Sequence, residues 1–325
     1  MITRRHFVVT AAASTFLPIL IGAHARAQTW PSRAVRLIVP LAAGGPTDFV
    51  ARLVADGLTK IWGQQVVIEN RSGAGTNIAA EVVARSDHDG YTILFATSSV
   101  AVNRTLYRSL SYDPMTDLVP VSHLTSFPFF VFVPKSVPAT SVKEFIAFAK
   151  ANSGKVTFGS PGTGSMPHLA SELFKRMAGI EMTHVPYRGA APALSDLIPG
   201  RVQFYIGSGA LLENMRAGQV RGLAVTGATR DPAAPELPTV AEAGVPGYEV
   251  SSWHGLFVPA KTPRHIVSKI NTDTVAALAD AVTKRKLEQG GYVVVGSAPE
   301  GLATLLNSEI DKWGAVIKQT DIKID

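Results

Sequence analysis

Val35-Arg-Leu-Ile-Val-Pro-Leu-Ala-Ala-Gly-Gly-Pro-Thr-Asp48 is the stretch of sequence that decides the fold of this chain. Its apolar first part, residues 35–40, predicts a buried strand, and its Gly-Gly-Pro centre predicts a tight turn. Apolar residues then recur at helical spacing from Phe49 to Leu58, so we expect a helix over residues 48–61. A strand that passes through a glycine turn into a helix is the repeating unit of α/β proteins.

The same alternation of strands and helices continues along the chain. It predicts an α/β fold with mostly parallel sheets. Further strands are expected at residues 65–69, 91–96, 156–159, 182–185, 202–206, 222–226, 255–258 and 292–295. Further helices are expected at residues 78–84, 142–151, 169–178, 192–198, 211–217, 266–278, 284–289 and 303–317.

Two breaks in this alternation, near Phe129 and Ser251, indicate that one domain is inserted into another. No Gly/Ser-rich linker separates the parts. We therefore expect a discontinuous first lobe, residues 28–128 and 252–325, and an inserted second lobe, residues 129–251. Two α/β lobes joined by two crossover segments would leave a ligand cleft between them, and such an arrangement is suited to hinge closure.

Residues 1–27 are predicted to be an export signal. Two arginines precede an apolar run over residues 8–23, and Ala25-Arg-Ala27 offers a cleavage site. The adjacent arginines also agree with the twin-arginine route. A membrane anchor is the alternative, but Pro18 interrupts the run, which is shorter than the ~20 apolar residues that a membrane span requires. The mature chain is expected to begin near Gln28 and to be released into the periplasm.

The composition is that of an ordinary globular protein. The chain has 325 residues, of which 46% are hydrophobic and 17% charged, and this length allows two domains. It has no cysteine, so disulfides and thiolate sites are excluded. The formal net charge of +6 includes three arginines of the predicted signal. The remaining basic excess suits small anions, and no basic cluster or stripe indicates nucleic-acid binding.

Enzyme motifs do not occur in the sequence. No Gly-x-Gly-x-x-Gly follows the first strand, the turn at 162–165 lacks the lysine of a phosphate-binding loop, and there is no Gly-x-Ser-x-Gly elbow. His, Asp and Glu residues do not occur at metal-ligand spacing. We predict no catalytic residue, no cofactor and no metal ion. The alternative is a hydrolase that uses Ser165 and His168.

The turns that follow the predicted strands are rich in glycine and hydroxyl residues. Ligands of open α/β sheets bind beyond the carboxyl ends of the strands, where helices begin. Glycine allows a close approach of the backbone, free N–H groups at a helix start carry positive partial charge, and hydroxyls donate hydrogen bonds. Together such turns predict a site for carboxylates built from dipoles. They are residues 40–48, 72–77, 96–99, 160–165 and 187–190.

Several motifs resemble those of one known family. They are Val39–Asp48, Val67-Ile-Glu-Asn-Arg-Ser-Gly-Ala-Gly75, Asp89-Gly-Tyr-Thr92, Ser160-Pro-Gly-Thr-Gly-Ser-Met-Pro-His-Leu169, His184-Val-Pro-Tyr-Arg-Gly189 and Pro238-Thr-Val-Ala-Glu-Ala-Gly-Val-Pro-Gly247. In order and spacing the mature chain is similar to the solute receptors of tripartite tricarboxylate transporters, often called the Bug family. The resemblance implies a two-lobed periplasmic binding protein of the type II-like fold that delivers small organic acids to a membrane permease.

The resemblance also implies which residues contact the ligand. In such receptors backbone amides, hydroxyls and ordered water hold the carboxylates. Relatives often have prolines where Leu41-Ala42-Ala43 stands, and an acidic or amide residue where this chain has Ser208. The expected ligand-binding residues are Gly45, Thr47, Asp48, Thr97, Ser98, Ser99, Ser160, Thr163, Gly164, Ser165, His168, Tyr187, Arg188, Gly189 and Ser208.

Some of these side chains have an equally ordinary structural reading. Asp48 stands at a helix start, where a carboxylate is favoured as a cap, so ligand contact and capping are both open. His168 and His184 are expected to pack rather than to bind. Arg188 is the fixed positive charge nearest the predicted cleft, and a guanidinium matches a carboxylate, but a solvated arginine remains the alternative.

The expected partners follow from the same resemblance. They are a small carboxylate and the membrane subunits of a tripartite tricarboxylate permease. A membrane sensor kinase is the alternative partner, and the receptor itself is expected to be a monomer.

Overall fold

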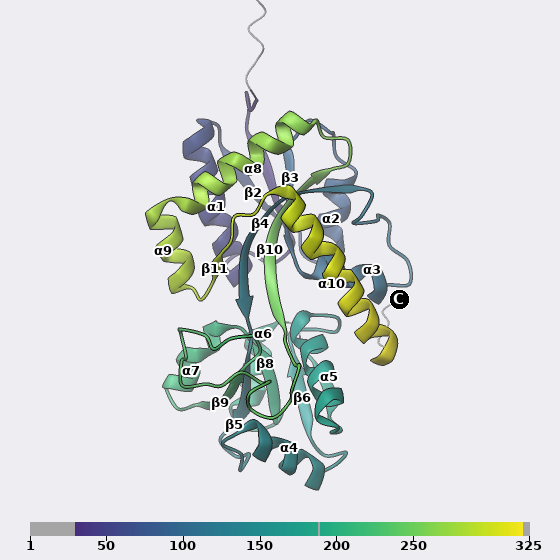
Figure 1. The fold of residues 1–325 in the computed structure, drawn as a ribbon, viewed down its shortest axis with the longest axis vertical. Coiled ribbons are helices and arrows are strands. Elements are labelled where there is room, and N and C mark those ends of the chain that lie inside the picture. Colours follow the sequence, from purple (N-terminus) through teal and green to yellow (C-terminus); the bar gives the residue numbers. More distant parts are fainter. Residues whose placement is uncertain (1–29, 188, 321–325) are drawn as a thin grey trace, which may run out of the picture.

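The computed structural model describes residues 30–187 and 189–320 (Figure 1). The predicted export signal and Arg188 lie outside the described residues. The strands are β1 (Val35–Val39), β2 (Val66–Asn70), β3 (Thr92–Thr97), β4 (Leu118–Pro128), β5 (Phe130–Pro134), β6 (Thr157–Ser160), β7 (Thr183–Pro186), β8 (Phe204–Gly207), β9 (Val220–Val225), β10 (Ser251–Pro259) and β11 (Val293–Val294). The helices are α1 (Pro46–Trp62), η1 (Ala74–Thr76), α2 (Asn77–Ala84), α3 (Ser99–Leu106), α4 (Val142–Ala151), α5 (Met166–Ala178), α6 (Ala190–Leu197), η2 (Gly209–Leu211), α7 (Leu212–Arg216), α8 (Arg264–Ala279), α9 (Ala281–Gln289) and α10 (Pro299–Thr320).

The first lobe is built on a sheet with the strand order β11-β4-β10-β3-β1-β2. Side chains alternate along β1. Leu37 and Val39 pack into a core cluster with α1 and α8, and Ile38 packs on the opposite face with α2 and α10. Because helices cover both faces of the sheet, the sequence of β1 is apolar at nearly every position.

The second lobe is built on a sheet with the order β7-β6-β8-β5-β9. It lies below the first lobe in Figure 1. The alternation in β5 sets its two faces. Phe130 and Phe132 pack with α6 and α7, whereas Val131 and Val133 pack with α4 and α5. Both lobes are therefore layered α/β units, as the sequence predicts.

The chain passes between the two sheets twice. It leaves the first sheet at the end of β4 and enters β5 directly after Phe129, and it returns through Val250 into β10. Figure 1 shows β4 and β10 as the long strands that reach from one lobe to the other. Thr226 joins the two passages, because its hydroxyl accepts a hydrogen bond from the Phe129 N–H at 2.8 Å and donates one to the Val250 carbonyl at 2.6 Å. The division of the chain at residues 128/129 and 251/252 remains our proposal.

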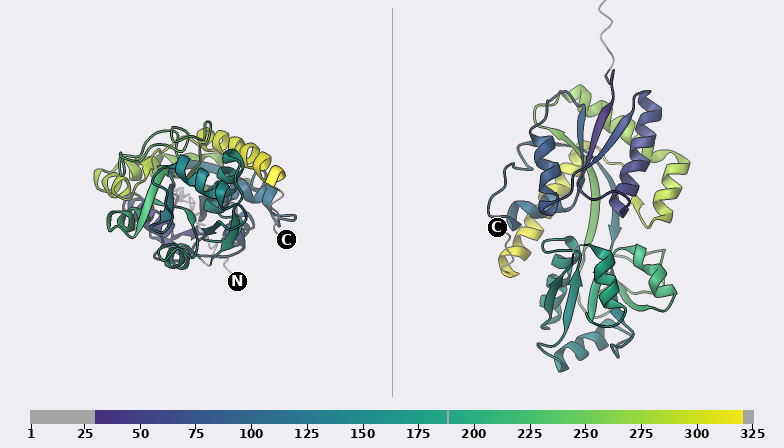
Figure 2. Two further views of the ribbon diagram at one scale, coloured as in Figure 1. Left: turned by 90° about the horizontal axis from the view of Figure 1, so that it is seen from below. Right: turned by 180° about the vertical axis from the view of Figure 1, so that it is seen from behind.

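The C-terminal helix α10 also connects the lobes. It starts over the first sheet and runs diagonally down to the second lobe (Figures 1 and 2). Trp313, Val316 and Ile317 belong to the same core cluster as Phe158 and Phe174 of the second lobe. The segment predicted to belong to the first lobe therefore also packs against the second.

The prediction of mostly parallel sheets was wrong, because both sheets are mixed. β10 is antiparallel to β3 and β4, β11 is antiparallel to β4, and β5 is antiparallel to β8 and β9. The strands β4 and β5, which contain Pro120, Pro128 and Pro134, were not predicted from the sequence pattern. A proline lacks the N–H that a strand ladder uses, so prolines in a strand weaken its signal. Helix α3 was missed as well.

Candidate functional site

The direction of the strands makes the predicted turns of the two lobes face each other. β10 starts directly after Val250, where the chain crosses between the lobes, and this place is called the crossing below. β10 runs antiparallel to β3, with His254 opposite Thr97, so the carboxyl end of β3 lies beside the crossing. β1 and β2 run in the same direction as β3. In the second lobe Phe130 pairs with Gly207, so the carboxyl end of β8 lies at the crossing, and β6 and β7 are parallel to β8. Carboxyl ends of strands from both sheets therefore meet between the lobes, where such folds bind ligands.

Asp48 shapes the turn between β1 and α1. Its side chain is 1% exposed and accepts hydrogen bonds from the Gly44 N–H at 2.9 Å, the Arg52 guanidinium at 2.7 Å and the Asn70 amide at 3.0 Å. Burial raises the pKa of Asp48, but these hydrogen bonds outweigh it and place the pKa below its usual value. The carboxylate therefore holds the loop and is not free to contact a ligand.

The backbone at the start of α1 is free to bind an anion. The N–H groups of Gly45, Thr47 and Asp48 have no hydrogen-bond partner among the described residues, and Pro46 has no N–H. Free N–H groups at a helix start carry positive partial charge and bind carboxylates. The Thr47 side chain points elsewhere, since it is buried with its hydroxyl 3.4 Å from His254 Nε2.

The turn after β3 contributes one unpartnered hydroxyl that is partly exposed. Ser98 is fully buried, its hydroxyl lies 2.7 Å from that of Ser252, and its N–H donates to Trp253. The Thr97 hydroxyl is buried without a partner in the described part of the chain. Ser99 is partly exposed, and no described residue bonds its hydroxyl. Of the predicted serines here, Ser99 is thus the one with a donor to offer.

Two stacked histidines support the 160–165 turn of the second lobe. The rings of His168 and His184 lie 3.8 Å apart between centroids. His168 Nδ1 accepts the N–H of Gly164, whose φ of +77° favours glycine, and His184 Nε2 lies 2.7 Å from the Ser160 hydroxyl. The expectation that both histidines pack agrees with this geometry. At the tip of the turn, Thr163 is exposed.

Burial is also the main reason why these rings stay neutral. Burial, together with His184 and Lys175, lowers the pKa of His168 to about 3. Burial and Lys175 lower the pKa of His184 to about 4. Neither ring therefore supplies a positive charge for a carboxylate near neutral pH.

Ser165 and His168 do not form a nucleophile–base pair. The Ser165 hydroxyl donates to the Gly162 carbonyl at 2.7 Å and accepts the backbone N–H of His168 at 3.4 Å, as the cap of α5. The imidazole Nδ1 is occupied by Gly164. Ser–His catalysis requires a hydrogen bond between the hydroxyl and the ring, and the two groups here have other partners.

The turn after β7 is tied to its own lobe. The Tyr187 hydroxyl donates to Asp196 at 2.7 Å, and the Gly189 N–H donates to the Pro161 carbonyl at 3.1 Å. Neither donor is free in this arrangement. The structure says nothing of Arg188, the remaining predicted residue of this turn.

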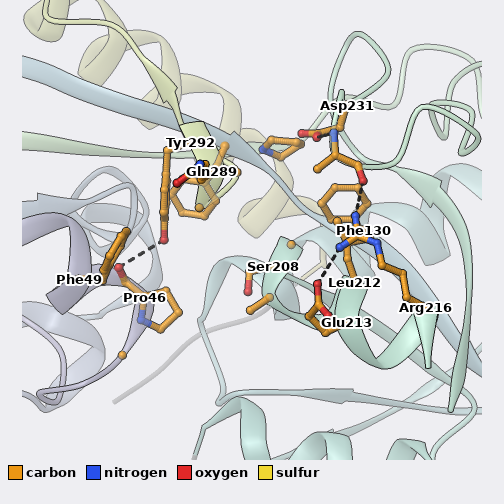
Figure 3. Close-up of a pocket in the computed structure, with 18 of the residues that line it drawn as sticks. Pro46, Phe49, Phe130, Ser208, Leu212, Glu213, Arg216, Asp231, Gln289 and Tyr292 are labelled. Atoms are coloured by element: carbon orange, nitrogen blue, oxygen red, sulfur yellow. Dashed lines mark hydrogen bonds and ion pairs between the residues drawn. The ribbon is translucent and has the colours of Figure 1, made fainter. Parts of the chain in front are cut away.

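A pocket of about 470 Å³ lies between the lobes and is lined by both (Figure 3). Of the expected ligand-binding residues it contains Gly45 and Ser208. No described residue bonds the Ser208 hydroxyl, so this side chain has a free donor. The lining consists of residues 44–46, 127–128, 208–210 and 289–292 with Phe49, Phe130, Leu212, Glu213, Arg216, Asp231 and Ala233.

Sequence reasoning missed the aromatic lining of this pocket. Phe49 was predicted only as part of the apolar spacing of a helix, and in the fold its side chain is 42% exposed and lines the pocket. Tyr292 was part of a predicted strand, and its hydroxyl donates to the Pro46 carbonyl at 3.3 Å. Periodicity gives the apolar face of a helix but does not tell whether its end faces a core or a cleft.

In the described part of the chain, no group of three potential metal ligands is arranged to hold an ion. No helix of that part is both long and apolar enough to span a membrane.

The chain is similar to a family model, to a curated relative and to two solved structures. Residues 50–322 match the model of the tripartite tricarboxylate transporter family receptor. The chain is 36% identical to BugT of Bordetella pertussis, over 94% of each protein. It is 43% identical to Rpa4515 of R. palustris, solved with adipate, with a TM-score of 0.83 over 90% of this chain and 99% of that one. It is 34% identical to MatC of Rhodopseudomonas palustris, solved with malate, with a TM-score of 0.80 over 89% and 100%.

The TM-scores of 0.83 and 0.80 show that the two solved relatives share the two-lobed α/β fold seen in Figure 1. The chain therefore belongs to the tripartite tricarboxylate transporter receptor family, which includes the Bug proteins.

Proposed function

We propose that this protein is a periplasmic receptor that captures a small organic acid between its lobes and delivers it to a tripartite tricarboxylate-type permease. The ligand class is a dicarboxylate, a tricarboxylate or a related carboxylate. The protein has no catalytic role in this proposal, acts as a monomer, and is exported with removal of residues 1–27.

The observation that carries the proposal is the set of free N–H groups at the start of α1, at Gly45, Thr47 and Asp48. They stand at the carboxyl end of β1, opposite the second lobe, and the hydroxyls of Ser99 and Ser208 have no partner among the described residues. Such an arrangement binds a carboxylate by dipoles and hydrogen bonds. The adipate and malate found in two relatives support the same ligand class.

Closure is the second element of the proposal. The lobes are joined at Phe129 and Val250, so rotation about these passages would bring the turns of the two lobes onto the ligand. The ligand is then withdrawn from water, and hydrogen bonds to its carboxylates strengthen.

A thermal-shift screen of the chain starting at Gln28 tests the binding. Succinate, malate, adipate and citrate serve as probes, with glucose as the uncharged control. A ligand that binds the folded state stabilises it by RT ln(1 + [L]/Kd), about 2.7 kcal/mol at a hundredfold excess over Kd. X-ray scattering with the best probe should show a smaller radius of gyration. If no carboxylate raises the melting temperature, the proposed function is wrong.

A further inference from the structure

The pocket between the lobes has an apolar wall on each side. Phe49 and Tyr292 of the first lobe face Phe130 and Leu212 of the second lobe across the opening (Figure 3). Phe130, Leu212 and Tyr292 are at least 92% buried in the folded chain and present only a small part of their surface to the pocket. Phe49, in the first turn of α1, is 42% exposed. A large exposed aromatic beside a binding turn points to a contact that a ligand completes.

The same wall adjoins the free N–H groups at the start of α1. Gly44, Gly45 and Pro46 line the pocket together with Phe49. A carboxylate held by the Gly45 N–H therefore places the body of its molecule next to the Phe49 ring. The N–H of Gly45 and the apolar wall therefore belong to one cavity.

Two of the polar side chains that line the pocket, Arg216 and Glu213, bond each other, and Ser208 keeps its free hydroxyl beside the apolar wall. Arg216 is the basic side chain among the lining residues, and it donates to Glu213 at 2.8 Å and to the Ala233 carbonyl at 2.7 Å. Asp231 accepts the Ala233 N–H at 2.7 Å. Hydroxyl groups along a ligand body would lose water without gaining partners at the apolar wall, and such burial is unfavourable.

We propose that this pocket selects carboxylates whose body is an unhydroxylated hydrocarbon, either a methylene chain or an aromatic ring, over hydroxylated acids of the same length. The proposal rests on the proposed function, because it assigns the substrate class of that same cleft. On closure the hydrocarbon body lies between Phe49 of one lobe and Phe130 and Leu212 of the other.

Calorimetric titration of the mature protein with adipate and galactarate tests the selection. Both are six-carbon dicarboxylates of equal charge, and they differ only in the hydroxyls along the chain. We expect adipate to bind at least about tenfold more tightly, because the hydrocarbon body buries apolar surface against the aromatic wall. Equal binding of the two acids, or tighter binding of galactarate, overturns the selection but leaves the receptor function intact. If neither these acids nor the other carboxylates of the screen bind, the proposed function itself fails.

The matched variants are Phe49→Ala and Ile61→Ala. Both residues lie on α1 with nearly equal exposure, 42% and 44%, but only Phe49 lines the pocket. We expect Phe49→Ala to weaken adipate binding about tenfold and to narrow its advantage over galactarate. Ile61→Ala should leave adipate binding unchanged. If Phe49→Ala binds adipate like the wild type, the pocket wall does not select the ligand body. Phe49→Leu, which keeps an apolar side chain, should restore most of the affinity.

Discussion

The carboxylate of Asp48 accepts a hydrogen bond from the backbone N–H of Gly44 at 2.9 Å, four residues earlier in the chain. This bond closes the glycine turn in front of α1, and the N–H groups of Gly45, Thr47 and Asp48 have no partner among the described residues. Arg52 and Asn70 hold the same carboxylate from two sides. Asp48 thus acts on the proposed ligand site through the shape of the loop.

Replacing Asp48 should therefore affect binding and folding together. Asp48→Ala removes several charge-assisted hydrogen bonds, each worth about 1.5–3 kcal/mol, and leaves the Arg52 guanidinium without its partner. We expect a lower urea midpoint and weaker carboxylate binding. Asp56→Ala, an exposed position on the same helix, is the control. Wild-type affinity in Asp48→Ala would show that the loop keeps its shape without the carboxylate.

The sequence around Asp48 was sufficient to predict the strand, turn and helix that surround it. The strand–turn–helix unit from Val35 to Trp62 was predicted because alternation, glycines and helical spacing all lie in one short segment. β4 was missed because it contains prolines at 120 and 128, and its neighbour β10 is distant in sequence. A strand of that kind is defined by its partner rather than by its own residues.

The candidate site shows the same limit at the level of single hydroxyls. Ser98 and Ser99 are neighbours in the sequence and look equivalent there. In the fold, Ser98 is buried against Ser252, a residue of β10, whereas Ser99 remains partly exposed. The glycine turns predicted where the site lies. Which hydroxyls are free to donate depends on packing against residues distant in the sequence, and the periodicity of the sequence does not indicate that packing.

Thr226 offers a test of the crossing. Thr226→Val keeps the shape of the side chain but leaves the Phe129 N–H and the Val250 carbonyl without this hydroxyl. The loss of a buried partner should cost about 1–3 kcal/mol in the free energy of unfolding. The exposed Thr229→Val, a few residues on, should be neutral. Chemical denaturation of both variants decides the point, and an unchanged midpoint in Thr226→Val would show that the hydroxyl does not join the passages.

The buried histidines predict a loss of stability in acid. The pKa of His168 is lowered to about 3, mainly by burial, whereas an unfolded histidine titrates near pH 6.5. The unfolded chain therefore binds protons first as the pH falls. The contribution to stability is complete above about pH 6.5 and is lost as the pH decreases toward 3, at no more than about 1.4 kcal/mol per pH unit for each such histidine.

Urea midpoints at pH 7.5 and pH 5.0 measure this dependence. His168→Asn retains an acceptor for the Gly164 N–H but does not titrate, so it should show a smaller decrease between the two pH values. His265→Asn, at an exposed position, should decrease as the wild type does. A decrease of equal size in His168→Asn would assign the acid sensitivity to other groups.

The last prediction separates hydroxyls that hold the fold from those that face the ligand. Ser98 and Ser165 have partners within their own lobe, at 2.7 Å in each case, so Ser98→Ala and Ser165→Ala should mainly lower the melting temperature. Ser208 lines the pocket with a free hydroxyl, so Ser208→Ala should mainly lower affinity, by about 0.5–1.5 kcal/mol for a neutral hydrogen bond and up to about 3 kcal/mol for one to a carboxylate. Melting temperature and calorimetric affinity, measured for all three variants with the best carboxylate, give two independent readouts. If Ser208→Ala keeps full affinity while Ser98→Ala or Ser165→Ala loses it without a change in melting temperature, the ligand lies along the turns after β3 and β6 and not in the pocket beside Ser208.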